Sequence, residues 1–70
     1  MGNKVQKELG EKLRIAREKQ KFTQAALAEK AGIHVNYYAR LERGEVNPSY
    51  EVLYKLINAL RIKSTEIFPS

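Results

Sequence analysis

The sequence contains no cysteine, no aspartate and no tryptophan, and its single histidine is His34. Without cysteine the chain can form neither a disulfide bond nor a thiolate metal site. One histidine cannot build a multi-histidine metal centre, and the usual nucleophile–base pairs of enzymes lack their residues. We therefore expect that the protein is not an enzyme and that it binds no metal and no other cofactor. Its stability should come from helix packing.

Long apolar runs are also missing. No stretch approaches the roughly 18 apolar residues that span a bilayer, and Met1–Lys7 lacks the apolar core of a signal peptide. A role of the basic first helix on a membrane surface is disfavoured, because its apolar face is thin, lacks tryptophan and is needed for the core. We expect a cytoplasmic protein with no membrane partner.

The chain has 70 residues, with 13 Lys and Arg against 8 Glu and a net charge of +5. A chain of this length forms one domain, here residues 1–70 with residues 1–3 frayed, and has no room for a small-molecule effector pocket. The positive charge is typical of nucleic-acid binders, although it is weak evidence by itself.

Apolar periodicity predicts five helical stretches and no strand, since no segment alternates with period two. The expected stretches are residues 4–19, 24–31, 35–43, 49–60 and 64–68. Apolar residues of the first stretch recur on one face, which we expect to be core: Val5, Leu9, Leu13 and Ala16. Thr23 and His34 precede the second and third stretches as N-caps, and Gly32 and Gly44 follow them as stops.

Gln24–Arg43 forms the informative unit, because two short helices are joined there by a tight turn at residues 32–34. This is the spacing of a helix-turn-helix. Ala28 keeps the helix crossing close, while Ile33 and Leu41 anchor the pair to the core. Such a unit can place one helix in the major groove of DNA, which is about 12 Å wide.

Four segments carry a family resemblance: LGEKLRIAREK, FTQAALAEKAGI, YYARLERGEVNPS and VLYKLINALRIKSTEIF. In this order and spacing the chain resembles the Cro and lambda-repressor-like regulators, also called the XRE-type family, over about residues 10–68. The resemblance implies an all-α, compact five-helix domain with a central helix-turn-helix. It also implies sequence-specific binding of double-stranded DNA as a transcriptional regulator, by default a repressor.

The resemblance also assigns contacts to residues. The positions that match the family's base-reading residues, with their neighbours, are Val35, Asn36, Tyr37, Ala39 and Arg40. Asparagine can pair with adenine, arginine can fork onto guanine, and valine or alanine can pack on a thymine methyl. The expected phosphate contacts are Thr23, Gln24, Arg43, Asn47 and Ser49. On an unrelated bundle, Asn36 and Arg40 would be solvated surface, and Val35 would pack at its helix end.

Arg17 and Glu42 match a family ion pair that ties the first helix to the end of the reading helix. The chain departs from the family pattern at three positions. Tyr38 replaces a smaller branched residue, Arg61 replaces a helix-ending glycine, and Glu45 lies in a loop that is often basic. The glutamate could weaken a phosphate contact.

A single reading helix makes few contacts, so we expect a homodimer on a two-fold symmetric, palindromic operator with half-sites about 34 Å apart. Ile62, Ile67 and Phe68 are the candidate interface, although all three could instead close the core of one protomer. The alternative function is a protein–protein interaction module, such as an antitoxin or a regulatory partner, with weak or non-specific DNA binding.

Overall fold

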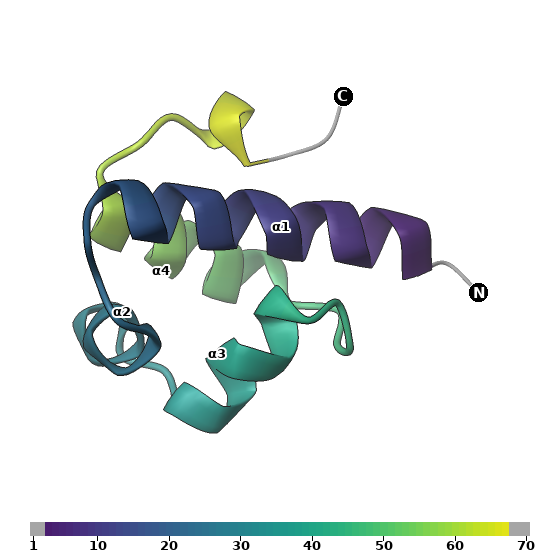
Figure 1. Ribbon diagram of the computed structural model, residues 1–70, viewed down its shortest axis with the longest axis horizontal. Coiled ribbons are helices and arrows are strands. Elements are labelled where there is room, and N and C mark those ends of the chain that lie inside the picture. Colours follow the sequence, from purple (N-terminus) through teal and green to yellow (C-terminus); the bar gives the residue numbers. More distant parts are fainter. Residues whose placement is uncertain (1–2, 68–70) are drawn as a thin grey trace.

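A computed structural model describes residues 3–67 of the chain. Within this range it contains four α-helices, one short 3-10 helix and no strand, so the expected all-helical fold is confirmed. The elements are α1 (Asn3–Lys19), α2 (Gln24–Ala31), α3 (Val35–Glu42), α4 (Tyr50–Leu60) and η1 (Ser64–Glu66). The long helix α1 runs along one side of the molecule, with α2 and α3 on one flank of it and α4 behind (Figure 1).

The predicted fifth stretch, a short turn or helix over residues 64–68, contains no α-helix in its described part, residues 64–67. In its place, η1 is a single turn of three residues, and its N-cap residue Lys63 makes no side-chain capping bond. The backbone bonds run from Glu66 N–H to the Lys63 carbonyl and from Ile67 N–H to the Ser64 carbonyl, which is the i→i+3 pattern. A segment this short closes only this tighter turn.

The N-cap predicted at Thr23 is confirmed, and Ser49, predicted as the first residue of its helix, is instead the N-cap of α4. The Thr23 hydroxyl accepts the Ala26 N–H at 3.0 Å at the start of α2, and the Ser49 hydroxyl accepts the Val52 N–H at 3.1 Å at the start of α4. These bonds satisfy N–H groups that have no partner inside the helix. Arg61 ends α4 in the left-handed region, at φ 56° and ψ 45°, a conformation that disfavours residues with a Cβ.

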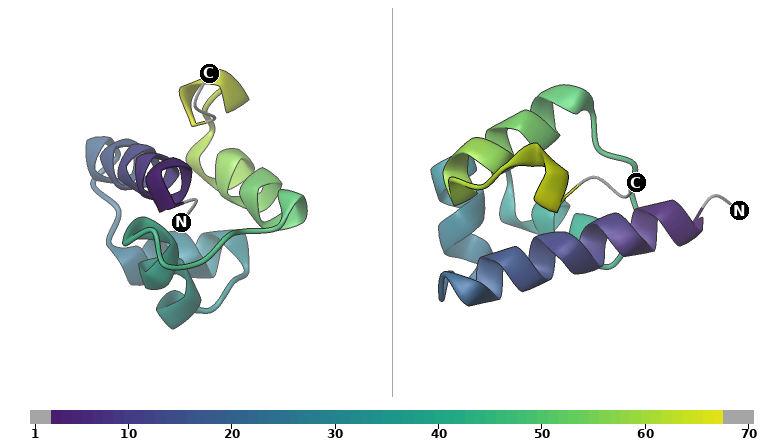
Figure 2. Two further views of the ribbon diagram at one scale, coloured as in Figure 1. Left: turned by 90° about the vertical axis from the view of Figure 1, so that its right-hand side faces the viewer. Right: turned by 90° about the horizontal axis from the view of Figure 1, so that it is seen from above.

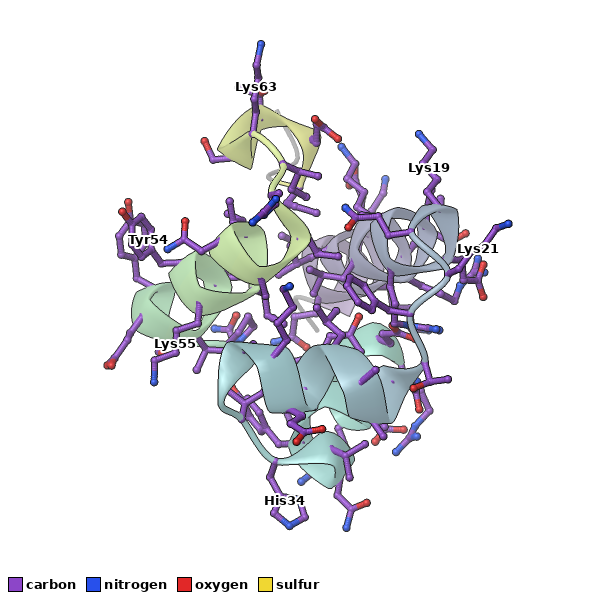
Figure 3. The ribbon with its side chains drawn as sticks, turned by 90° about the vertical axis from the view of Figure 1, so that its left-hand side faces the viewer. Lys19, Lys21, His34, Tyr54, Lys55 and Lys63 are labelled. Atoms are coloured by element: carbon purple, nitrogen blue, oxygen red, sulfur yellow. The ribbon has the colours of Figure 1, made fainter. Side chains whose placement is uncertain are left out.

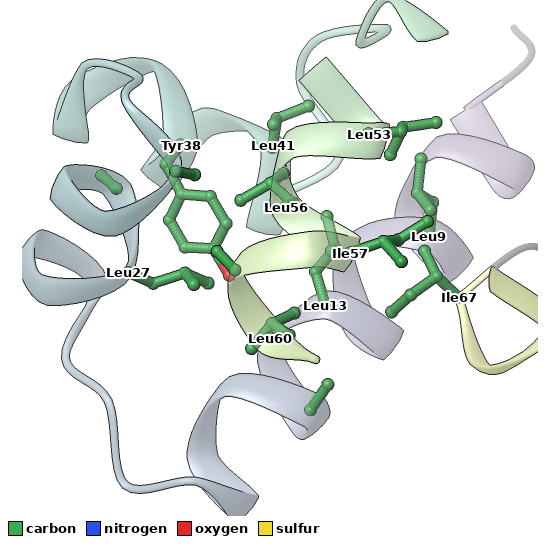
Figure 4. Close-up of a cluster of buried hydrophobic side chains, with 14 residues drawn as sticks. Leu9, Leu13, Leu27, Tyr38, Leu41, Leu53, Leu56, Ile57, Leu60 and Ile67 are labelled. Carbon is green, nitrogen blue, oxygen red and sulfur yellow. The ribbon is translucent and has the colours of Figure 1, made fainter. Parts of the chain in front are cut away.

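The core lies between α1, α4 and the α2–α3 pair (Figure 4). Its fully buried leucines come from every helix: Leu13, Leu27, Leu41, Leu56 and Leu60. Leu9, Leu13 and Ala16 of α1 are buried as expected. Val5, expected on the same face, is 59% exposed, because the first turn of α1 extends past the other helices (Figures 1 and 2).

Gly10 brings α1 against the end of α3. It is buried, and a Cβ built at this position would lie 2.4 Å from the Leu41 carbonyl oxygen and 2.5 Å from that of Glu42. No side chain larger than hydrogen fits at this distance without moving one helix. The close approach therefore fixes how far the C-terminal end of α3 stands from α1.

Candidate nucleic-acid interface

The α2–turn–α3 unit has the geometry that the sequence predicts. Gly32 takes a φ of 75° after α2, and Ile33 N–H then donates to the Ala28 carbonyl at 2.9 Å. His34 caps α3, since its Nδ1 accepts the Asn36 N–H at 3.2 Å, and it lies at the outer end of the unit (Figure 3). Ala28 is 1% exposed, so the two helices cross over a methyl group.

Helix α3 has one buried and one exposed face. Tyr38 and Leu41 point into the core, at 0% and 2% exposure. Val35, Asn36 and Arg40 are exposed on the other side. Asn36 and Arg40 are four residues apart and so lie one above the other on the helix surface. Of the remaining candidate base-reading residues, Tyr37 and Ala39 are half-buried beside this face.

The candidate phosphate-contacting residues divide into two groups. The side chains of Thr23, Gln24 and Ser49 already have partners within the domain: the two hydroxyls cap helices, and Gln24 Nε2 donates to Glu42 Oε1 at 3.0 Å. Arg43 and Asn47 are exposed. Both lie between the reading helix and α4, on the loop side of α3.

A cluster of four side chains holds α1, α2 and α3 together; we call it the hub, and it comprises Arg17, Gln24, Tyr38 and Glu42. Arg17 Nε donates to Glu42 Oε2 at 2.6 Å and Arg17 Nη2 to Glu42 Oε1 at 3.2 Å. Arg17 Nη1 also donates to the Phe22 carbonyl at 2.7 Å. The Arg17 side chain is 11% exposed and that of Glu42 is 4% exposed. The expected pair of Arg17 and Glu42 is therefore present, and it is largely shielded from solvent.

The sequence predicts the pair of Arg17 and Glu42 but not the roles of Gln24 and Tyr38 in the hub. Tyr38 is a bulky departure from the family pattern, and its hydroxyl donates to Glu42 Oε2 at 2.5 Å. The two residues are four apart on one helix, and that spacing could have indicated the bond. The larger side chain therefore fills the core and supplies a donor to the buried carboxylate.

Three pKa values are shifted in the hub, and chiefly the hydrogen bond to Glu42 raises that of the Arg17 guanidinium above its usual value. Burial disfavours the charged form of Glu42, but hydrogen bonds from Arg17, Tyr38 and Gln24 outweigh it and lower the pKa of this carboxyl below 4.5. Burial, followed by the hydrogen bond to Glu42, raises the pKa of the Tyr38 hydroxyl well above its ordinary value. At neutral pH the hub therefore contains an ionised carboxylate and a neutral phenol.

Glu45, in the loop after α3, faces two candidate DNA-contacting arginines. Its carboxylate accepts hydrogen bonds from Arg43 Nε at 2.8 Å and Arg43 Nη2 at 3.2 Å, and it lies 3.6 Å from Arg40 Nε. Chiefly the hydrogen bond from Arg43 holds the pKa of Glu45 below its usual value. The carboxylate is therefore charged, and it offsets part of the positive charge of these two arginines.

The predicted dimer interface is wrong for Ile67, which is fully buried in the core of the protomer. η1 folds back beside α1 and α4 (Figure 2), and this places Ile67 next to Leu9 (Figure 4). Ile62 is half-buried against the same core, and Phe68 lies outside the described residues. The alternative interpretation, that these residues close the protomer core, thus applies to Ile67.

Among residues 3–67 there is no group of three or more His, Asp or Glu side chains that could hold a metal ion. In the same range, no helix is long and apolar enough to cross a membrane.

These features define a helix-turn-helix domain whose second helix, α3, has an exposed face with polar side chains. The sequence profile of the helix-turn-helix family HTH_3 matches residues 13–67, and the chain belongs to this family. It is 37% identical over 59 residues to the immunity repressor protein of Bacillus phage phi105. The match covers 84% of this chain and 41% of the phage repressor, so the chain spans about two fifths of that protein's length.

Solved structures with the same fold come from gene regulators. The restriction-modification controller protein C.AhdI from Aeromonas hydrophila has a TM-score of 0.86 and 34% identity, covering 89% of this chain and 94% of its own. Two structures of the clp gene regulator ClgR from Corynebacterium glutamicum have TM-scores of 0.87 and 0.86, both at 30% identity, covering 90% of this chain and 81% and 67% of their own.

Proposed function

We propose that this chain is the sequence-specific DNA-binding domain of a transcriptional repressor and not an enzyme, with α3 as the helix that enters the major groove. The observation that carries the proposal is the exposed face of α3, on which Asn36 and Arg40 point outward one helical turn apart. The names of the similar proteins, an immunity repressor, a restriction-modification controller and a gene regulator, support the same function.

Base reading is assigned to the exposed edge of α3. Asn36 has the amide that pairs with the N6 and N7 edge of adenine, and Arg40 has the fork that pairs with O6 and N7 of guanine. Each good bidentate pair contributes about 1–3 kcal/mol of discrimination. Val35 and Ala39 offer methyl groups to thymine. Tyr37 is half-buried, and its exposed part would contact the bases beside them.

Phosphate contacts are assigned to both ends of the helix-turn-helix. On the α2 side, the first N–H groups of the helix lack intrahelical partners and favour an anion. The Thr23 hydroxyl accepts the capping bond and can still donate its own hydrogen, as can the Ser49 hydroxyl at α4. Gln24 keeps one amide N–H beyond the one that it gives to Glu42. Arg43 and Asn47 would contact the opposite stretch of backbone.

We propose a homodimer for binding to a palindromic operator, with half-sites about one helical turn, roughly 34 Å, apart. Because Ile67 is buried, the interface must use other apolar surface. Among the described residues outside α1 and α3, the large exposed apolar side chains are Tyr50 and Tyr54 of α4, at 77% and 59% exposure. Together with the half-buried Ile62, they are the candidates.

The test is the selection of bound duplexes from a random pool at physiological salt, with the wild type, Arg40→Ala and Arg14→Ala compared in parallel. Arg14 is the matched control, because it is an exposed arginine on α1 paired only with Glu11 and Glu18. We expect a palindromic consensus that loses one base pair of each half-site with Arg40→Ala and is unchanged with Arg14→Ala. Retention without a consensus, equally salt-sensitive in all three proteins, would refute base reading and favour the protein-interaction alternative.

A further inference from the structure

Glu45 is anchored to the end of α3 through its backbone. Its own N–H donates to the Arg40 carbonyl at 3.0 Å. The preceding Gly44 is buried at a φ of 74°, and a Cβ there would lie 2.7 Å from the Lys7 side chain. The turn that carries Glu45 is therefore fixed both to the end of α3 and to α1.

The two arginines meet this carboxylate in different ways. Arg43 is bound through both Nε and Nη2, so one full edge of its guanidinium is occupied. The nearest approach of Arg40 to the carboxylate is 3.6 Å, from Nε, which is a charge contact rather than a hydrogen bond. An arginine has five N–H donors in a fixed fork. Since the nearest Arg40 nitrogen is 3.6 Å from Glu45, none of the Arg40 donors, Nη1 and Nη2 at the outer end included, is used in a hydrogen bond to this carboxylate.

We infer that Glu45 is a specificity-determining residue of the proposed DNA interface: it occupies the edge of Arg43 that would bind phosphate, and it leaves the outer end of Arg40 free to bind guanine. The inference rests on the proposed function. Phosphate contacts add affinity for every sequence, whereas base contacts separate one sequence from another. A carboxylate that competes with phosphate for Arg43 therefore lowers non-specific binding more than it lowers binding to the operator.

The deciding variant is Glu45→Gln, which removes the charge and keeps the shape of the side chain. Its matched control is Glu51→Gln in α4, which removes an equal charge from an exposed residue that faces Lys55 at 3.6 Å. Dissociation constants are measured for the selected duplex and for a scrambled duplex over a range of salt concentrations. Melting temperatures are recorded for each variant.

For Glu45→Gln we expect scrambled DNA to be bound about fivefold more tightly near physiological salt, because one extra phosphate contact is gained. The slope of log K against log salt should steepen by about 0.9. Affinity for the selected duplex should rise less, so that the ratio of the two affinities falls. Glu51→Gln should leave both the slope and the ratio unchanged. In an Arg43→Ala background, Glu45→Gln should no longer change binding to scrambled DNA.

Equal effects of the two glutamate variants would overturn the inference, because they would mean that only net charge matters. An unchanged or increased affinity ratio with Glu45→Gln would also overturn it, and so would an undiminished effect in the Arg43→Ala background. These outcomes leave the proposed function standing as long as the wild type selects a consensus. If the wild type selects none, the proposed function itself fails, and the inference fails with it.

Discussion

Replacing Arg17 with methionine tests whether the hub stabilises the position of the reading helix. Methionine keeps an unbranched apolar stem but removes the guanidinium, so the protein loses two hydrogen bonds to Glu42 and one to the Phe22 carbonyl. Glu42, at 4% side-chain exposure, is left as a carboxylate without a cationic partner. Its remaining donors are the Tyr38 hydroxyl and the Gln24 amide.

Breaking a buried pair by removing one partner costs about 3–5 kcal/mol. Because two neutral groups still donate to Glu42, we expect a loss of unfolding free energy near the lower end of this range, at about 3 kcal/mol. For a domain of this size each kcal/mol lowers Tm by about 4–8 °C, so Tm should fall by about 12–24 °C. Thermal unfolding followed by circular dichroism measures this directly.

Arg14→Met is the matched control for this measurement. Arg14 lies on the same helix and forms pairs of 2.9 and 3.0 Å with Glu11 and Glu18, but its side chain is 40% exposed and those of its partners are more exposed still. Water screens such pairs, so Tm should barely change. Equal melting temperatures for the two variants would refute the argument. Adding Glu42→Gln to Arg17→Met should restore part of the loss, because the buried charge is then gone.

Three further changes test other parts of the fold. Gly10→Ala should lower stability by about 1–2 kcal/mol, because a Cβ 2.4 Å from the Leu41 carbonyl oxygen outweighs the better helix propensity; a higher Tm would contradict the packing described. Arg61→Gly should raise stability by about 0.5–1 kcal/mol, because glycine adopts the φ of 56° without strain, and urea unfolding would show it. Because the pKa of Glu42 is lowered in the folded state, its contribution to stability is present above the unfolded pKa near 4.5 and is lost as pH falls through the lower folded pKa. In Glu42→Gln the free energy of unfolding should therefore vary less with pH over this acid range.

The helix-turn-helix could be predicted from the sequence because its determinants are local. Gly32, His34 and the apolar spacing of α3 act within a few residues, and they fix the turn and the buried face. The bond from Tyr38 to Glu42 and the pairing of Arg43 with Glu45 are equally short in sequence. The preferences of single residues do not predict these bonds, because each depends on a pair of side chains at the right spacing.

The C-terminal segment and the first turn of α1 were harder to predict, for a different reason. Periodicity places Val5 on the same face as Leu9, but it cannot say where the covering helices end, and Val5 is exposed. Ile67 follows the last α-helix without any repeat, so the sequence cannot tell whether it packs inward or against another copy. It is buried in the same core cluster as Leu9, which lies near the other end of the chain.

The hub has a thermodynamic consequence for DNA binding. Since α3 is bonded to α1 and α2 before any duplex arrives, binding requires no folding of the protein, and its heat-capacity change should reflect only the surface that the two molecules cover. A reading helix held this firmly also cannot adjust its tilt to a groove of different width. The duplex must then supply the adjustment, so base steps that bend or twist easily should be favoured even at operator positions that no side chain touches.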